Sequence, residues 1–107
     1  MATLRRWNPL ACVLFTRGAE GASLHLQTRN WSAKPPPIKV VDTVGAGDAS
    51  MGGLIASLIR QPQADPADHL SAAVAAGAVA CTVAGAHPPS EDQIRALMGH
   101  IHVQNTT

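Results

Sequence analysis

One stretch, residues 40–53, constrains the fold of this chain more than any other. It begins with a β-branched run, passes through Gly45, Ala46 and Gly47, and continues with apolar residues at the i, i+3, i+4, i+7, i+8 spacing of one helix face. These apolar residues are Met51, Leu54, Ile55, Leu58 and Ile59. The spacing predicts a helix that buries this face. Its N-terminus then offers unpaired backbone N–H groups and the positive end of the helix dipole to an anion.

Asp48 directly follows the glycines, and its position has two interpretations. The helix dipole favours a carboxylate in the first turn of any helix, which is a purely structural role. The same position also places the carboxylate at the mouth of the predicted anion site, where it could take part in chemistry. The residues alone leave both interpretations open.

Strand signals dominate the first part of the chain. The apolar run at 11–16 predicts a strand buried on both faces, and the alternation at 23–27 predicts a half-buried strand that closes a hairpin. Residues 30–37, with three consecutive prolines, are predicted as a loop. Residues 38–41 are predicted as the strand that leads into the central stretch.

Helix signals dominate the second part. Asp65 as N-cap and Pro66 at the first position begin a helix predicted from about 67 to 84. Its shared face is made almost entirely of small residues, which allows close packing: Leu70, Ala73, Val74, Gly77, Ala78 and Cys81. Ser90 and Gln93 form the capping box of a final helix with an apolar stripe at 94, 97, 98 and 101. Residues 102–107 are predicted to fray. Together these elements predict an α/β fold.

Composition excludes several classes of function. The chain has 107 residues, 46% of them hydrophobic and 14% charged, which indicates one packed domain. A formal net charge of +1 gives no electrostatic basis for binding nucleic acid or an anionic membrane. The uncharged run at 70–86 is shorter than the ~20 residues of a membrane span. Cys12 and Cys81 lie in separate apolar runs and are predicted to be buried, reduced thiols of a cytoplasmic protein.

Residues 42–49, with the sequence DTVGAGDA, resemble the second signature of the ribokinase-type (PfkB) carbohydrate kinases. The following MGGL at 51–54 also fits the family, and the alanine-rich segment at 75–82 is most similar to its fructokinase-like branch. The resemblance implies the C-terminal part of a ribokinase-like three-layer α/β/α fold, here a hairpin, a short strand and three helices. Residues 1–107 would be a C-terminal fragment that holds the nucleotide-binding part of the domain.

The resemblance implies ATP-dependent transfer of a phosphoryl group to a sugar hydroxyl. Asp48 would be the general base, and the amides of Gly45, Ala46 and Gly47 would stabilise charge on the transferred phosphoryl oxygens. Mg²⁺ would arrive with the nucleotide. The sugar is the expected partner of the full-length form.

The resemblance also implies a nucleotide site and a cation site. Residues 16–21 resemble a Thr-x-Gly-x-x-Gly turn that borders the nucleotide, although the same residues also suit a plain hairpin turn. The implied nucleotide-binding residues are Thr16, Gly18, Gly21, Gly47 and Val74. A monovalent cation, usually K⁺, is implied beside the Asp42 carboxylate and the backbone carbonyls of Val44, Ala80, Val83 and Gly85. Ser50, Val74 and Pro89 depart from residues that are common in the family at these positions.

The chain matches only the C-terminal third of such a kinase, and two alternatives therefore stay open. The first is a catalytically inactive remnant that binds nucleotide or self-associates through an open sheet edge and apolar helix faces. The second is a dinucleotide-binding module, because Gly45 and Gly47 lie between a predicted strand and a helix. Ser50 replaces the third glycine of that fingerprint, and no second strand ending in an acidic residue follows at ~20 residues.

Overall fold

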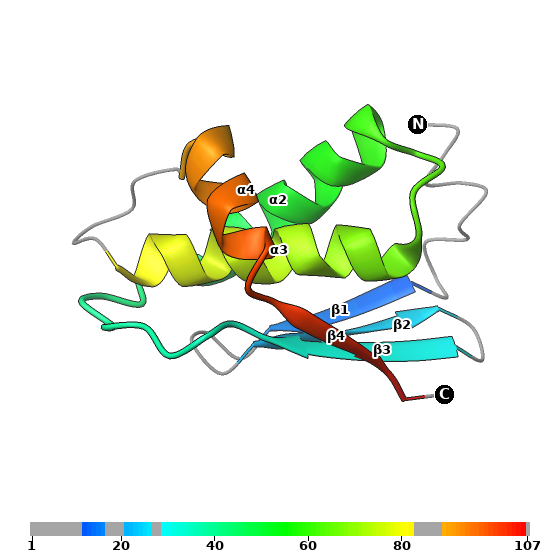
Figure 1. Cartoon of the computed structure of the whole chain (residues 1–107), viewed down its shortest axis with the longest axis horizontal. Helices are drawn as coiled ribbons and strands as arrows, with labels where there is room; N and C mark the ends of the chain where they lie inside the picture. The colour runs from blue at the N-terminus through cyan, green and yellow to red at the C-terminus, as the bar shows by residue number, and fades with distance from the viewer. Residues whose placement is uncertain (1–11, 17–20, 27–28, 83–88, 107) are drawn as a thin grey trace.

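The computed structural model of the chain describes residues 12–16, 21–26, 29–82 and 89–106. Strands β1 (Cys12–Thr16), β2 (Ala22–Leu26) and β3 (Arg29–Lys34) come first, and helices α2 (Ala46–Arg60), α3 (Pro66–Cys81) and α4 (Glu91–Met98) follow. Strand β4 (His102–Asn105) is last. The strands form one antiparallel sheet in the order β1-β2-β3-β4, and the helices cover one of its faces (Figure 1). The predicted α/β class is confirmed, and two of the three predicted layers lie within the described residues.

The sheet is apolar on the side of the helices and polar on the other side. The inward residues Ala22, Leu24, Trp31 and Ala33 form a buried cluster with Leu70 and Val74 of α3. On β2 and β3 the alternate positions are polar: His25 Nδ1 lies 2.6 Å from Asn30 Oδ1, and its Nε2 lies 3.1 Å from Ser23 Oγ. Period-two alternation therefore gives the sheet one apolar face that packs on α3 and one polar face, on which Ser23 is nevertheless buried.

Helix α3 is the centre of the molecule. It lies between the sheet and the other two helices, and nearly its whole circumference is buried. Its small residues let α2 approach closely: a Cβ built on Gly53 would lie 2.8 Å from Ala76 Cβ and 3.0 Å from the Ala72 carbonyl oxygen. The close packing predicted from the alanine-rich face is confirmed.

Replacing either of two adjacent glycines of α2 by alanine should change the stability of the fold, in opposite directions for the two positions. A Cβ at Gly52 would meet nothing within 4 Å, so Gly52→Ala should raise the free energy of unfolding by about 0.5–1 kcal/mol, the helix-propensity gain. Gly53→Ala should lower it by about 1–3 kcal/mol, because the added methyl overpacks the contact with α3. Urea unfolding of both variants measures the difference; equal effects would contradict the tight α2–α3 contact.

Three predictions about the strands are wrong. Residues 30–34 of the predicted loop belong to β3, because Trp31 and Ala33 alternate into the core before the prolines begin at 35. The tail does not fray over its whole length, because β4 pairs with β3 from His102↔Lys34 to Asn105↔Trp31. Residues 38–41 are not a strand. At the end of that segment the backbone of Val41 instead bonds to the end of α3.

Two burial predictions are also wrong for this chain. Among the described strands β1 lies at an edge of the sheet, and Thr16 is exposed rather than buried. The side chains of Cys12, Val13 and Phe15 lie outside the described residues. On α2, Leu54 and Leu58 are buried as predicted, but Met51 and Ile59 are exposed. The cause is that α2 packs mainly on α3, with fewer contacts to β1, so one side of its predicted apolar face has little cover within the described residues.

The predicted starts of helices α3 and α4 are confirmed. Asp65 is the N-cap of α3 with Pro66 at the first position, and Ser90 and Gln93 form both bonds of the capping box of α4. Helix α3 ends at Cys81, earlier than the predicted 84, with Thr82 as its C-cap. Cys81 is buried and free of any disulfide, as predicted.

A buried histidine makes folding stability depend on pH. His69 is fully buried, its Nδ1 lies 2.7 Å from Ser57 Oγ, and burial lowers its pKa below the ordinary 6.5, although Asp68 opposes the shift. The unfolded chain therefore takes up the proton first. The stability that the neutral ring contributes is complete above about pH 6.5 and is lost as the pH falls below it.

We expect the urea concentration at the unfolding midpoint to decrease when the pH is lowered from 7.5 to 5.5. The decrease should be smaller in His69→Gln than in the unchanged chain. His100, an exposed histidine, supplies the control: His100→Gln should keep the full pH dependence. If the urea midpoint of His69→Gln depended on pH as strongly as that of the unchanged chain, other groups would cause the pH dependence.

Candidate active site

The candidate site is built at the start of α2, where a tight turn positions the backbone. The Asp42 carboxylate accepts a hydrogen bond from the Val44 N–H at 2.9 Å, which closes the turn. Gly45 then adopts the left-handed conformation, with φ 80° and ψ 0°, and is the N-cap of the helix. A residue with a Cβ resists this conformation, so a glycine is required here to start the helix directly after the turn.

Three amides remain open at this helix N-terminus. The Ala46 N–H already donates to the Thr43 carbonyl at 3.2 Å, and Ala46 itself is buried. Within the described residues, no acceptor lies against the N–H groups of Gly45, Gly47 or Asp48. The predicted set of amides is therefore revised: Ala46 leaves it, and the amide of Asp48 joins it. Three converging N–H groups at the positive end of a helix form a cradle for an anion.

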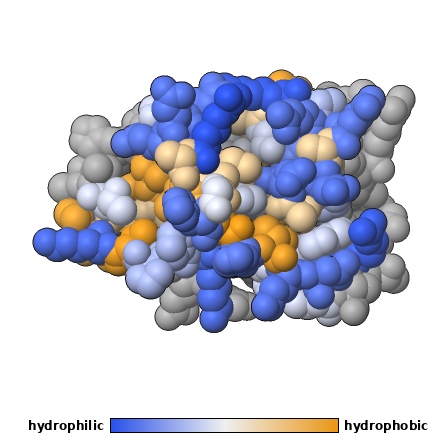
Figure 2. All heavy atoms as spheres, in the orientation of Figure 1, coloured by the Kyte–Doolittle hydropathy of each residue, from blue (hydrophilic) through white to orange (hydrophobic). Residues whose placement is uncertain are grey.

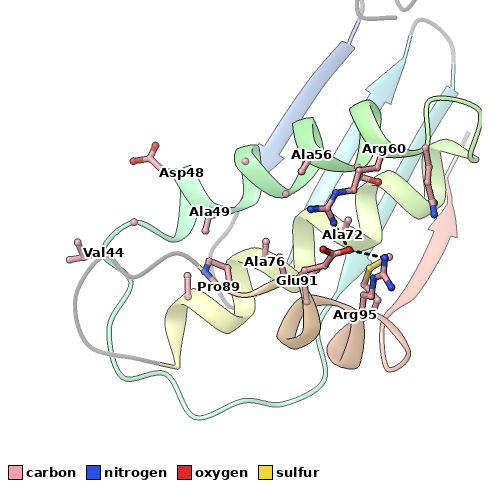
Figure 3. Close-up of a pocket in the computed structure, with 18 residues that line it drawn as sticks. Val44, Asp48, Ala49, Ala56, Arg60, Ala72, Ala76, Pro89, Glu91 and Arg95 are labelled. Carbon is pink, nitrogen blue, oxygen red and sulfur yellow. Dashed lines mark ion pairs between the residues drawn. The ribbon is translucent and has the colours of Figure 1, made fainter.

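The Asp48 side chain projects outward from the first turn of α2 and is exposed (Figure 3). It is not turned into the core, and it lies on the same helical turn as the open amides. Thr16, at the end of β1, joins this region from the sheet: a Cβ built on Gly47 would lie 3.8 Å from the Thr16 hydroxyl oxygen. The structure thus brings Thr16, from the end of β1, next to the helix start that holds Gly45, Gly47 and Asp48.

A groove of about 650 Å³ begins beside the amide cradle and runs between α2, α3 and α4 (Figure 3). Gly45, Asp48 and Ala49 line its first part, and small residues form its walls. At its far end Glu91 bridges two arginines: it pairs with Arg60 of α2, and with Arg95 at 2.7 Å. The volume of the groove is in the range of small-molecule binding sites.

The segment around Asp42 lies against the C-terminal end of α3. The Cys81 carbonyl accepts hydrogen bonds from the Val41 N–H at 2.7 Å and the Asp42 N–H at 3.2 Å. Burial raises the pKa of the Cys81 thiol, and the nearby Asp42 carboxylate raises it further. The thiol is therefore neutral at pH 7. A carboxylate beside the negative end of a helix is an arrangement that suits a cation. Val83 and Gly85, two of the predicted ligands, lie outside the described residues.

Val74 and Gly21, two of the other predicted nucleotide-binding residues, lie apart from the site. Val74 is buried in the cluster between α3 and the sheet, so its side chain is covered by the protein itself. Gly21 has φ 107°, and a Cβ there would lie 2.1 Å from the Ala33 carbonyl oxygen, so close strand packing accounts for this glycine. Gly18 lies outside the described residues.

Sequence reasoning missed two backbone contributions. The open amide of Asp48 could have been counted, because the first amides of any helix lack intrahelical acceptors. The anchoring of the turn by the Cys81 carbonyl had no signal in the sequence, because it joins backbone atoms of segments some 40 positions apart.

Comparison with known proteins agrees with this fold. Residues 7–93 match the pfkB family carbohydrate kinase, and the chain belongs to this family. The 1-phosphofructokinase of Escherichia coli strain K12 is 39% identical over 95 residues, which are 89% of this chain and 30% of that enzyme. The chain therefore spans about 30% of the length of such relatives.

Solved structures of the family superpose on the chain. Phosphofructokinase-2 from Escherichia coli, in complex with potassium, has a TM-score of 0.74 and 28% identity, with 83% of this chain and 28% of that chain covered. Fructokinase from Vibrio cholerae O395, in its fructose-, ADP- and calcium-bound form, has a TM-score of 0.71 and 30% identity, with 89% and 33% covered. The ribokinase-like fold is thus confirmed. In the described part of the chain, no helix combines the length and the hydropathy needed to cross a bilayer.

Proposed function

We propose that this chain is the part of an ATP-dependent sugar kinase that binds the transferred phosphoryl group and supplies the general base. The observation that carries the proposal is the set of open amides of Gly45, Gly47 and Asp48 beside the exposed Asp48 carboxylate. Kinase relatives with this fold supply the reaction class. The fragment by itself lacks most of the length of those relatives, so sugar binding is assigned to the whole fold.

In the proposed step, the sugar hydroxyl attacks the γ-phosphorus of ATP. Asp48 accepts the hydroxyl proton as the new oxygen–phosphorus bond forms, and the bond to the β-phosphate oxygen breaks to release ADP. The amides of the cradle stabilise the charge of the transferred phosphoryl oxygens, where the transition state concentrates it. The Thr16 hydroxyl lies beside Gly47 and would contact the nucleotide there.

Two cations belong to the proposal. Mg²⁺ would arrive with the nucleotide and would neutralise its phosphates. A monovalent cation would be held by Asp42 and the carbonyls of Val44 and Ala80. The hydrogen bonds that tie Asp42 to the end of α3 support this second site.

A chimeric enzyme tests the proposal. In it, this chain replaces the matched 95-residue segment of the E. coli 1-phosphofructokinase. We expect ATP-dependent phosphorylation of the parent enzyme's substrate by the chimera, and none by the isolated chain. A folded chimera that binds ATP but transfers no phosphoryl group would favour the alternative of an inactive nucleotide-binding remnant.

A further inference from the structure

A serine and a histidine meet in the contact between α2 and α3, away from the amide cradle. Oγ of Ser57, on α2, lies 2.7 Å from Nδ1 of His69, in the first turn of α3. Ser57 and Asp48 are on the same helix, about 14 Å apart along its axis at the usual helical rise. The proposed phosphoryl transfer therefore makes no use of this pair.

The surroundings of His69 make its ring a proton acceptor. The side chain is fully buried, and burial lowers its pKa below 6.5, so the ring is neutral at pH 7. The ring also has a hydrogen bond to the Ala64 backbone. A neutral ring carries one N–H, and with that N–H directed at the Ala64 carbonyl, Nδ1 accepts the hydrogen of the Ser57 hydroxyl. A nucleophile, a base and a group that orients the base form the arrangement that activates a serine.

The Ser57 side chain is accessible from the groove between α2, α3 and α4. It is half-buried and lines the groove, together with Ala72 and Ala76 of α3 and Ile94 and Met98 of α4. On the face shown in Figure 2, hydrophilic side chains cover much of the surface over α2 and α4, so this apolar lining differs from its surroundings. A small apolar group fits such a lining beside the hydroxyl.

A guanidinium lies one helical turn beyond Ser57. Arg60 lines the same end of the groove and pairs with Glu91, which also pairs with Arg95 (Figure 3). Residues three apart on a helix are neighbours on its surface. A guanidinium has five N–H donors, and an ion pair with one shared carboxylate uses only part of them. Arg60 can therefore stabilise negative charge that develops on an oxygen next to Ser57.

We propose that Ser57 and His69 form a catalytic dyad that hydrolyses carboxylic esters with a short apolar acyl group. The Ser57 oxygen attacks the ester carbonyl carbon while Nδ1 of His69 takes the hydroxyl proton, and Arg60 stabilises the oxyanion. The bond to the alcohol oxygen then breaks, His69 gives the proton to the leaving alcohol, and the acyl group stays on Ser57. Water attacks the acyl-serine and gives a proton to His69. The carboxylic acid leaves, and His69 returns the proton to Ser57. This activity does not depend on the proposed kinase function.

A fluorophosphonate probe tests the proposal on the unchanged chain. The probe forms a covalent bond to an activated serine oxygen and loses fluoride. We expect Ser57 to be labelled at least about tenfold faster than Ser90, as measured by mass spectrometry of the two peptides. Ser90 is the matched control, because its hydroxyl accepts the Gln93 N–H as the cap of α4. Ser90 is also the more exposed of the two serines, so faster labelling of Ser57 would not come from accessibility.

Two substitutions separate catalysis from a structural role of the same hydrogen bond. His69→Gln can still bond to Ser57 but cannot take its proton, so the labelling of Ser57 should slow at least about tenfold while that of Ser90 stays unchanged. Hydrolysis of p-nitrophenyl acetate should fall at least about tenfold in Ser57→Ala. Circular dichroism shows whether the variants fold; if they do not, the comparison of Ser57 with Ser90 in the unchanged chain decides.

Three results would overturn the proposal. They are equal labelling of Ser57 and Ser90, unchanged labelling of Ser57 in folded His69→Gln, and undiminished ester hydrolysis in folded Ser57→Ala. The bond between Ser57 and His69 would then only link α2 to α3. Loss of kinase activity in the chimera leaves this test intact.

Discussion

Asp48→Asn should lower the kcat of the chimeric enzyme by about 10²–10⁴-fold, the range expected for the loss of a general base. The amide side chain keeps the size and the hydrogen-bonding position of the carboxylate but cannot accept the hydroxyl proton. Because the cradle amides belong to the backbone, the KM for ATP should change little. Steady-state kinetics with varied ATP separate the two parameters.

Asp92 provides a matched control, because it is also an exposed carboxylate in the first turn of a helix. If Asp48 served only the helix dipole, Asp48→Asn and Asp92→Asn would each cost about 0.3–1 kcal/mol of stability and nothing in kcat. We expect similar stability costs but a loss of kcat in Asp48→Asn alone. If the kcat of Asp48→Asn were unchanged, Asp48 would not be the general base.

Gly21→Ala should lower the free energy of unfolding by about 3 kcal/mol or more. Gly21 is buried at the start of β2 with φ 107°, and its Cβ would lie 2.1 Å from the Ala33 carbonyl oxygen and 2.9 Å from Lys34 Cα. These are backbone atoms of β3, which cannot turn away as a flexible side chain could. The substitution therefore adds both conformational strain and a clash within the sheet. Thermal and urea unfolding measure the loss.

Gly99→Ala controls for the general effect of replacing a glycine. Gly99 has φ −62°, and its Cβ would make only an ordinary contact at 3.8 Å with the Ala96 carbonyl oxygen. Its stability should change by less than about 1 kcal/mol. If Gly21→Ala were as mild as Gly99→Ala, the close approach of β2 and β3 at Gly21 would be refuted.

Local signals in the sequence predicted the parts of the fold that are set locally. The helix start at Ser90 follows from its capping box, and the start of α3 follows from Pro66 at the first position, since the Asp65 side chain makes no capping hydrogen bond. The turn at Gly45 before α2 follows from the conformational freedom of glycine. Family membership and the ribokinase-like fold followed from the DTVGAGDA segment. The hairpin of β1 and β2 was likewise predicted from alternation.

Features that depend on distant partners could not be predicted. Strand β4 carries a weak strand signal of its own and is defined by its pairing with β3, some 70 residues earlier in the chain. The end of residues 38–41 bonds to the Cys81 carbonyl, which removes it from any sheet. At the site, periodicity could not show that Val74 faces the sheet or that the Ala46 amide is already used by Thr43.

The central claim is that the helix N-terminus binds phosphate through the amides of Gly45, Gly47 and Asp48. The most direct measurement is a ¹⁵N–¹H NMR titration of the isolated chain with MgATP. A second titration with adenosine, which carries no phosphate, is the control. We expect these three amide resonances to shift with MgATP and not with adenosine, while the amide resonance of Gly99 is unaffected by either. MgATP binding that shifts other resonances and leaves these three in place would contradict the account.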